Sequence, residues 1–155
     1  MGILKVIFAF AVIAAVIYVL FPDAFSQIAS FFSVPESGWR SVRMGNEIFR
    51  LEVAATEDKR IKGLAGRDGM PGDQGIIFVF DEAGSYGITM QGMRFDLDII
   101  WVRNKQIVDI VENAKPSMAL EQKVYYPISD ADTVIELNAG TAERLNLNQG
   151  DRLSW

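Results

Sequence analysis

The sequence predicts a mainly β domain with one or two short helices (α+β), folded as a small closed barrel or sandwich and preceded by one transmembrane helix. Two observations predict this. The chain opens with a long apolar run, and after residue 38 short strand-like runs alternate with turns rich in glycine and asparagine. We therefore divide it into a transmembrane signal anchor (1–22), an interfacial segment and linker (23–38), and a β-rich domain (39–155).

The apolar run extends from residue 3 to residue 21 and is broken only by Lys5. A helix of this length spans about 28 Å, close to the hydrocarbon core of a bilayer. Lys5 precedes the span, so the positive-inside rule keeps the N-terminus cytoplasmic and places the domain outside, in the periplasm or extracellular space. Two alternatives stay open. One is a cleaved signal peptide, although no good Ala-x-Ala pattern follows, and the other is a buried helix, although no polar stripe is visible.

Composition restricts the possible chemistry. With 15 basic and 20 acidic residues the net charge is −5, which argues against an extended nucleic-acid surface. The chain has neither cysteine nor histidine. It therefore lacks disulfides, zinc-thiolate sites and the commonest general base and transition-metal ligand. We expect no cofactor, and any catalysis would depend on carboxylates, Lys, Ser, Thr or Tyr.

The first half of the domain contains a hairpin, a helix and a glycine-rich loop. Trp39–Arg43 and Glu47–Val53 read as paired strands, and Phe49, Leu51 and Val53 give the second an apolar face. Thr56 is a candidate N-cap for a helix that ends near Gly63. The loop from 63 to 75 is no P-loop; its amides could face an anion, but an irregular connection is the simpler interpretation.

The second half contains further strands and a short helix. The run 75–80 is continuously apolar and indicates a strand covered on both faces. Residues 95–103 and 106–111 form a second predicted hairpin, whose first strand is apolar on both faces near its middle, as in a closed barrel or sandwich. The remaining predicted elements are a strand over 133–137, a helix over 142–147 and a last strand ending at Trp155.

These motifs together resemble a known family. The residues Gly63-Leu64 with Arg67, the run 75–80, Met90 and Leu97-Asp98-Ile99 are similar to successive motifs of domain of unknown function 192 (DUF192), and so are the closing segments 135–140 and 150–151. The resemblance covers about residues 47 to 153. It implies a compact β-rich domain with few helices, often behind a signal sequence or membrane anchor, and no established reaction.

The sequence departs from the family pattern at two places. The family tends to carry an aromatic pair and a lysine around the methionine, where this chain has Ile88, Thr89 and Gln91. It also tends to have proline where this chain has Asp96. If this patch binds a ligand, we expect it to prefer a less anionic one.

Asp96 and Asp98 are the candidate pair of carboxylates. Two residues apart on a strand, they would share one face at a spacing of about 6.6 Å. Such a pair could hold a hard cation or act as acid and base, but a strand supplies too few oxygen ligands. We therefore assign no catalytic residue and no metal site. Asp98 lies between apolar residues and is expected to be buried, and the resemblance makes Arg67 the candidate counter-charge.

The leading functional interpretation is a membrane-anchored extracytoplasmic binding or interaction module, which is not an enzyme. Its partners would be the membrane, through the N-terminal helix, and an unknown small ligand or envelope protein, but no nucleic acid. The alternative is an envelope hydrolase that uses the carboxylates Asp96 and Asp98. The candidate ligand-binding or structural site comprises Arg67, Met90, Gln91, Asp96 and Asp98.

Overall fold

The computed structural model describes residues 38–117 and 123–155. The chain divides into two units, 1–34 and 35–155, and every described residue belongs to the second. The expected anchor and nearly all of the expected linker lie outside the described residues. Within the described ranges, no helix is both long and apolar enough to cross a bilayer.

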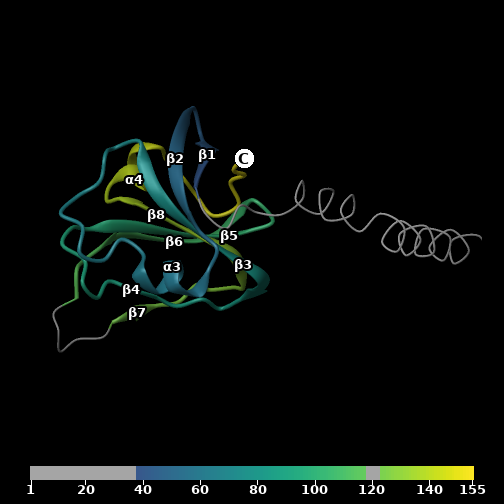
Figure 1. The fold of residues 1–155 in the computed structure, drawn as a ribbon. Helices are drawn as coiled ribbons and strands as arrows, with labels where there is room; N and C mark the ends of the chain where they lie inside the picture. Colours follow the sequence, from purple (N-terminus) through teal and green to yellow (C-terminus); the bar gives the residue numbers. More distant parts are fainter. Residues whose placement is uncertain (1–37, 118–122) are drawn as a thin grey trace, which may run out of the picture. The chain divides into compact units, whose positions relative to one another are not determined.

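Six strands form the main sheet, in the order β1-β2-β3-β8-β5-β6 (Figure 1). Neighbouring strands run antiparallel except β2 and β3, which are parallel. The strands are β1 (Trp39–Met44), β2 (Glu47–Ala54), β3 (Gln74–Gly84), β8 (Ala131–Asn138), β5 (Leu97–Arg103) and β6 (Gln106–Ala114).

Two short helices and a second, two-stranded sheet complete the described fold. Helix α3 (Glu57–Lys62) lies on the connection between the parallel strands β2 and β3, and helix α4 (Thr141–Arg144) follows β8. The small sheet pairs β4 (Ile88–Thr89) with β7 (Val124–Tyr125). The prediction of a mainly β domain with short helices is therefore confirmed.

The expected closed barrel or sandwich is wrong, because the six-stranded sheet is open. Strands β1 and β6 are its two edges and do not pair with each other. The last residues of the chain contact both edges, through single bridges between Arg43 and Ser154 and between Gln106 and Arg152. These isolated bridges take the place of the predicted last strand. Without a continuous ladder at this position, the sheet does not close.

Both predicted hairpins are confirmed. In the first, Met44 pairs with Glu47 across a turn in which Gly45 has a φ of +56°. In the second, Arg103 pairs with Gln106, and the two turn residues between them, Asn104 and Lys105, both have positive φ values. Two successive positive φ values match a type I′ turn, whose twist suits antiparallel strands.

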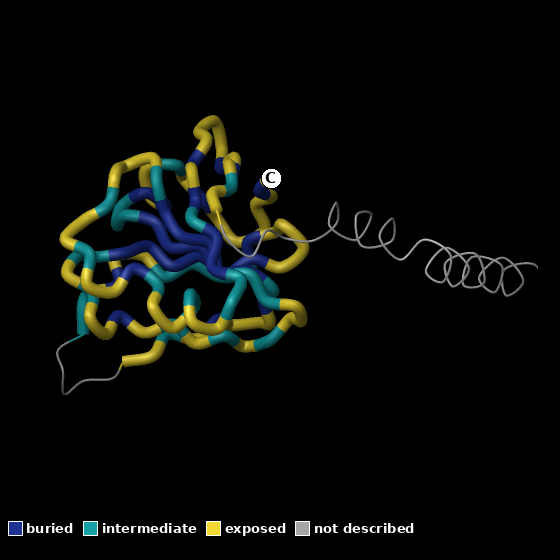
Figure 2. Tube along the Cα trace, viewed as in Figure 1, coloured by how far each residue is buried: buried dark blue, intermediate teal, exposed yellow. Residues whose placement is uncertain are grey.

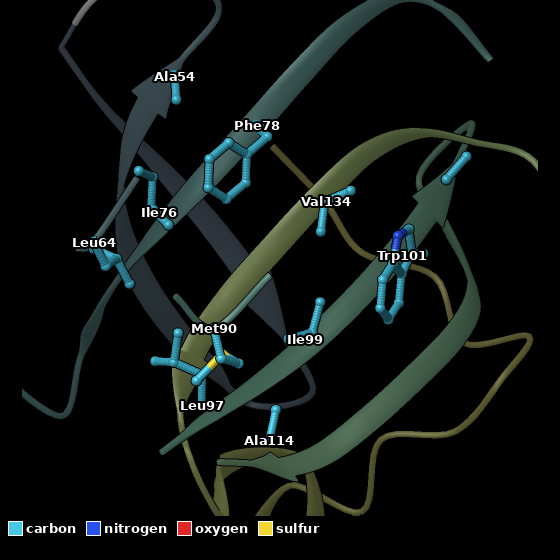
Figure 3. Packing of buried hydrophobic residues seen from close by; sticks show 11 residues of the cluster. Ala54, Leu64, Ile76, Phe78, Met90, Leu97, Ile99, Trp101, Ala114 and Val134 are labelled. Atoms are coloured by element: carbon cyan, nitrogen blue, oxygen red, sulfur yellow. The ribbon is translucent and has the colours of Figure 1, made fainter. Parts of the chain in front are cut away.

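The middle of the sheet is buried on both faces (Figure 2). On β5, Leu97, Ile99 and Trp101 belong to one hydrophobic cluster, and the alternation of side chains directs Asp98 and Ile100 to the opposite face. The cluster also contains Leu64, Ile76 and Met90 (Figure 3). The face that carries the cluster is called the pocket face below.

The strands β2, β3 and β8 approach one another closely at Gly75. A Cβ atom at this position would lie 2.5 Å from the backbone oxygen of Glu136 and 2.8 Å from a methyl group of Leu51. Only glycine fits such a distance. The close approach brings the backbone of Glu136 directly beside β3.

Candidate functional site

A cavity of about 480 Å³ opens on the pocket face of the sheet. Its lining comes from α3 and the loop after it, from β3, from the segment around β4, and from Glu136 on β8. Three of the lining residues are buried, namely Leu64, Phe78 and Glu136, and the others are exposed or half-buried. The buried residues form the floor, so the one carboxyl group at the bottom of the cavity is that of Glu136.

Glu136 lies in apolar surroundings. The strand register places it between Ile76 on β3 and Ile99 on β5, and Val134 is its neighbour on the same face of β8. Glu136 is only 5% exposed. This burial raises the pKa of the Glu136 carboxyl from 4.5 to about 8, because an apolar environment disfavours the charged form.

The carboxyl group of Glu136 has no hydrogen bond or ion pair with any described residue. Every fully enclosed polar side-chain atom in the described ranges has a partner. The Glu136 oxygens are therefore not fully enclosed, and the small surface that they keep faces the cavity. A buried polar group without a protein partner is rare and calls for a physical explanation.

One wall of the cavity is a fixed aromatic stack. The rings of Phe80 and Tyr86 lie parallel, with centroids 3.5 Å apart. Tyr86 is held at two points: its hydroxyl donates to the backbone oxygen of Glu82 at 2.8 Å, and its own backbone oxygen accepts from Nε1 of Trp101 at 2.8 Å. These bonds hold the wall in place without a ligand.

Arg60 completes this wall from α3. Its guanidinium carbon lies 5.0 Å from the centroid of Phe80, and one guanidinium nitrogen donates to the backbone oxygens of Ala55 and Val79, the latter at 3.0 Å. Arg60 is therefore held by backbone and ring and forms no ion pair with Glu136. The other charged residues of the lining are the exposed Glu57 and Lys62.

The residues expected from the sequence are spread over both faces of the sheet. Gln91 lines the cavity, and Met90 beside it is fully buried in the hydrophobic cluster. Arg67, Asp96 and Asp98 do not line the cavity.

The expected pairing of Asp98 with Arg67 is wrong. Asp98 is fully buried, and its carboxylate accepts backbone N–H groups from Asn113 at 2.9 Å, Ala142 at 2.8 Å and Gly140 at 3.2 Å. Arg67 instead pairs with Glu52 at 2.6 Å, and both of these side chains are about one-third exposed. Amides at the start of α4 and at the end of β6 therefore take the role that a counter-charge was expected to fill.

Asp96 lies just before β5 and pairs with Lys115. The expected pair of carboxylates on one strand face is thus not formed, because one is enclosed within the strand and the other lies outside it. In the described part of the chain, no cluster of three or more acidic residues has the geometry of a metal site.

Sequence reasoning missed Glu136, Arg60, Phe80 and Tyr86. For Glu136 a signal was available, since the acid shares its strand face with Val134 and the strand is apolar on its other face. Ile76 and Ile99 on the flanking strands complete the burial of Glu136, and only the strand order shows that these residues lie beside it. No local pattern indicated that Arg60 and Tyr86 would meet at Phe80.

The fold and the site define a β-rich domain that carries a ligand-sized pocket on one face of an open sheet. The family model for DUF192, described as "Uncharacterized ACR", matches residues 40–155. The chain therefore belongs to the DUF192 family, as its motifs predicted.

Relatives of known sequence or structure agree with this assignment. A UPF0127 protein of Thermococcus gammatolerans is 30% identical over 108 residues, which cover 68% of this chain; the chain spans about 65% of that relative's length. A solved protein of unknown function from Novosphingobium aromaticivorans matches with a TM-score of 0.69 and 29% identity, over 79% of this chain and 90% of that one. A structure from Sinorhizobium meliloti, described as "a putative transcription regulator", matches with a TM-score of 0.70 and 28% identity, over 79% of this chain and 97% of that one.

We predict that Asp98→Asn lowers the free energy of unfolding by about 3 kcal/mol, because the amide presents an N–H₂ group to buried N–H donors. The control is Asp96→Asn, which removes an exposed ion pair and should cost less than about 1 kcal/mol. Urea denaturation measures both. Adding Arg67→Met to Asp98→Asn should give additive losses because the two residues have separate partners, and strong coupling between them would contradict this.

We also predict a specific pH dependence from Glu136. Its pKa is higher in the folded protein than in the unfolded chain, so between about pH 5 and pH 8 the folded form holds a proton that the unfolded form releases. Rising pH therefore favours unfolding. Relative to Glu136→Gln, the wild type should lose up to about 1.4 kcal/mol of stability per pH unit in this window. Denaturation curves of both proteins at several pH values test this, and a constant difference would contradict it.

Proposed function

We propose that this domain is a binding module for a small molecule, held outside the cytoplasm by an N-terminal membrane anchor, and that the cavity above Glu136 is its site. The observation that carries the proposal is the buried carboxyl group that faces the cavity and has no partner among the described residues. Ligand sites are typically apolar cavities of several hundred cubic ångströms with a few polar groups and a perturbed pKa.

The fixed walls of the cavity also support binding. The stack of Phe80 and Tyr86 is held by hydrogen bonds, and Arg60 is held by two backbone oxygens. A wall that is already ordered loses little conformational entropy when a ligand binds. The site therefore has the properties of a preorganised pocket.

The geometry gives less support to the alternative of a hydrolase that uses Asp96 and Asp98. The Asp98 carboxylate accepts three backbone amides and is enclosed, and Asp96 pairs with Lys115. Neither residue lines the cavity. A general acid or base has to reach the reacting group directly or through one water, so the binding function is the better-supported proposal.

The pocket proposal predicts that small aromatic fragments bind the full chain and that Ala65→Trp weakens them at least tenfold, by filling the cavity from its rim. Ala65 is exposed and lines the cavity. The matched control is Ala83→Trp, which introduces the same side chain at an exposed position outside the lining and should leave binding unchanged. Ligand-observed saturation-transfer NMR measures the affinities. Equal effects of the two variants would rule out the cavity as the site.

The anchor proposal rests on the apolar run before residue 22 and on Lys5 at its N-terminal side. A phosphatase reporter that is active only outside the cytoplasm, fused after Trp155, should be active, and the protein should fractionate with membranes. The control fusion carries two additional lysines after residue 22 in place of Lys5, which should reduce reporter activity by reversing the charge bias. An inactive reporter on the unaltered chain would refute the orientation.

A further inference from the structure

We propose that the floor of the pocket recognises an uncharged hydrogen-bond acceptor on a compact apolar ligand, the carbonyl oxygen of an amide, ester or ketone, and that Glu136 donates the hydrogen bond. This inference rests on the proposed function and specifies the ligand class that the site would take.

Apolar side chains flank the Glu136 carboxyl on both neighbouring strands. The flanking strands present Ile76 and Ile99 at its register positions, and neither can accept or donate a hydrogen bond through its side chain. From α3 the cavity is lined by Glu57, Arg60 and Lys62. Arg60 is bound to two backbone oxygens and to the ring of Phe80, and no ion pair joins Glu136 to any described cation.

The titratable side chain on the remaining wall is also engaged. Tyr86 donates its hydroxyl hydrogen to the backbone oxygen of Glu82. No described residue therefore forms an ion pair or a hydrogen bond with the Glu136 carboxyl, although the side chains of Thr89 and Gln91 also line the cavity. In such surroundings the uncharged acid is the favoured form, in agreement with the raised pKa of this residue. An uncharged carboxyl group has one O–H donor, and its complement is an acceptor on the ligand.

A cationic ligand is the main competitor, because it could form an ion pair with ionised Glu136. That pair would require both charges to lose their hydration in an apolar floor formed with Leu64 and Phe78, a cost that their attraction often fails to offset. The other charged lining residues also oppose a cationic ligand, because the two positive charges of Arg60 and Lys62 exceed the one negative charge of Glu57. An uncharged acceptor requires no charge to lose its hydration, and the positive lining residues do not repel it.

The unpartnered donor also provides selectivity. A ligand that fills the cavity without an acceptor leaves the O–H group of Glu136 buried and unsatisfied, which costs as much as a lost hydrogen bond. Sites that are built to bond a polar group therefore reject analogues that lack it. The apolar floor binds the ligand body, and Glu136 selects the head group.

The test compares two probes with the same phenylpropyl skeleton, 3-phenylpropionamide and 3-phenylpropylamine, on the full chain in detergent micelles. At pH 6.5 the amide should bind the wild type more tightly than the amine. Glu136→Leu should weaken amide binding about tenfold, because it removes the donor at similar volume. Glu136→Gln should bind the amide within a few fold of wild type, since its side-chain N–H can still donate.

A pH series separates donation by Glu136 from a purely structural role. Amide binding to the wild type should weaken between pH 6.5 and pH 9.5 as the carboxyl ionises, whereas Glu136→Gln should show a flat profile. Both proteins contain the same lysines and tyrosines, so a difference between the profiles reports on Glu136.

Three results would overturn the inference: tighter binding of the amine, equal amide affinity of wild type and Glu136→Leu, or identical pH profiles for wild type and Glu136→Gln. If Ala65→Trp still weakens the probes in these cases, the pocket stands and only the ligand class fails. If neither probe binds and Ala65→Trp has no effect on any fragment, the proposed function and this inference fail together.

Discussion

The enclosure of β5 and β8 on both faces is the constraint on which the rest of the structure depends. These strands lie side by side within the sheet, and nearly all of their residues are buried. A charged side chain on such a strand must therefore find partners or give up its charge. Asp98 and Glu136 meet this constraint on neighbouring strands, one residue apart in register and on opposite faces of the sheet.

The two carboxyl groups satisfy the constraint in different ways. Asp98 collects three backbone amides and thereby joins the central strand β5 to the end of β6 and to the start of α4. Its role is architectural, because all of its partners belong to the domain. No described backbone amide donates to Glu136, and the layer above it, which includes α3 and β4, leaves a space instead of filling it. The constraint is therefore met by hydrogen bonds within the domain on one face, and by an acid with a raised pKa beside a cavity on the other.

The sequence predicted those features that depend on neighbouring residues. Both hairpins and the buried run of β3 followed from local alternation and from turn residues such as Asn104. Features that depend on strand order were either missed or predicted wrongly. The antiparallel insertion of β8 between β3 and β5 encloses Glu136, and no local pattern specifies it. Arg67 was expected as the partner of Asp98 through the family resemblance, but the three backbone amides that bind Asp98 come from segments that only the strand order brings together. The two residues of β7 are too few to show a period.

The segment after residue 149 has a consequence for association between copies of the chain. An open sheet exposes unpaired N–H and C=O groups at both edges, and such edges can template intermolecular strand pairing and aggregation. Here the backbone of Ser154 accepts from the N–H group of Arg43 and donates to its oxygen, on the edge formed by β1. The same short segment forms backbone hydrogen bonds with Lys105 and Ile107 beside the other edge. One stretch of chain thus shields both margins at these positions, a protection against aggregation that barrels obtain by closing.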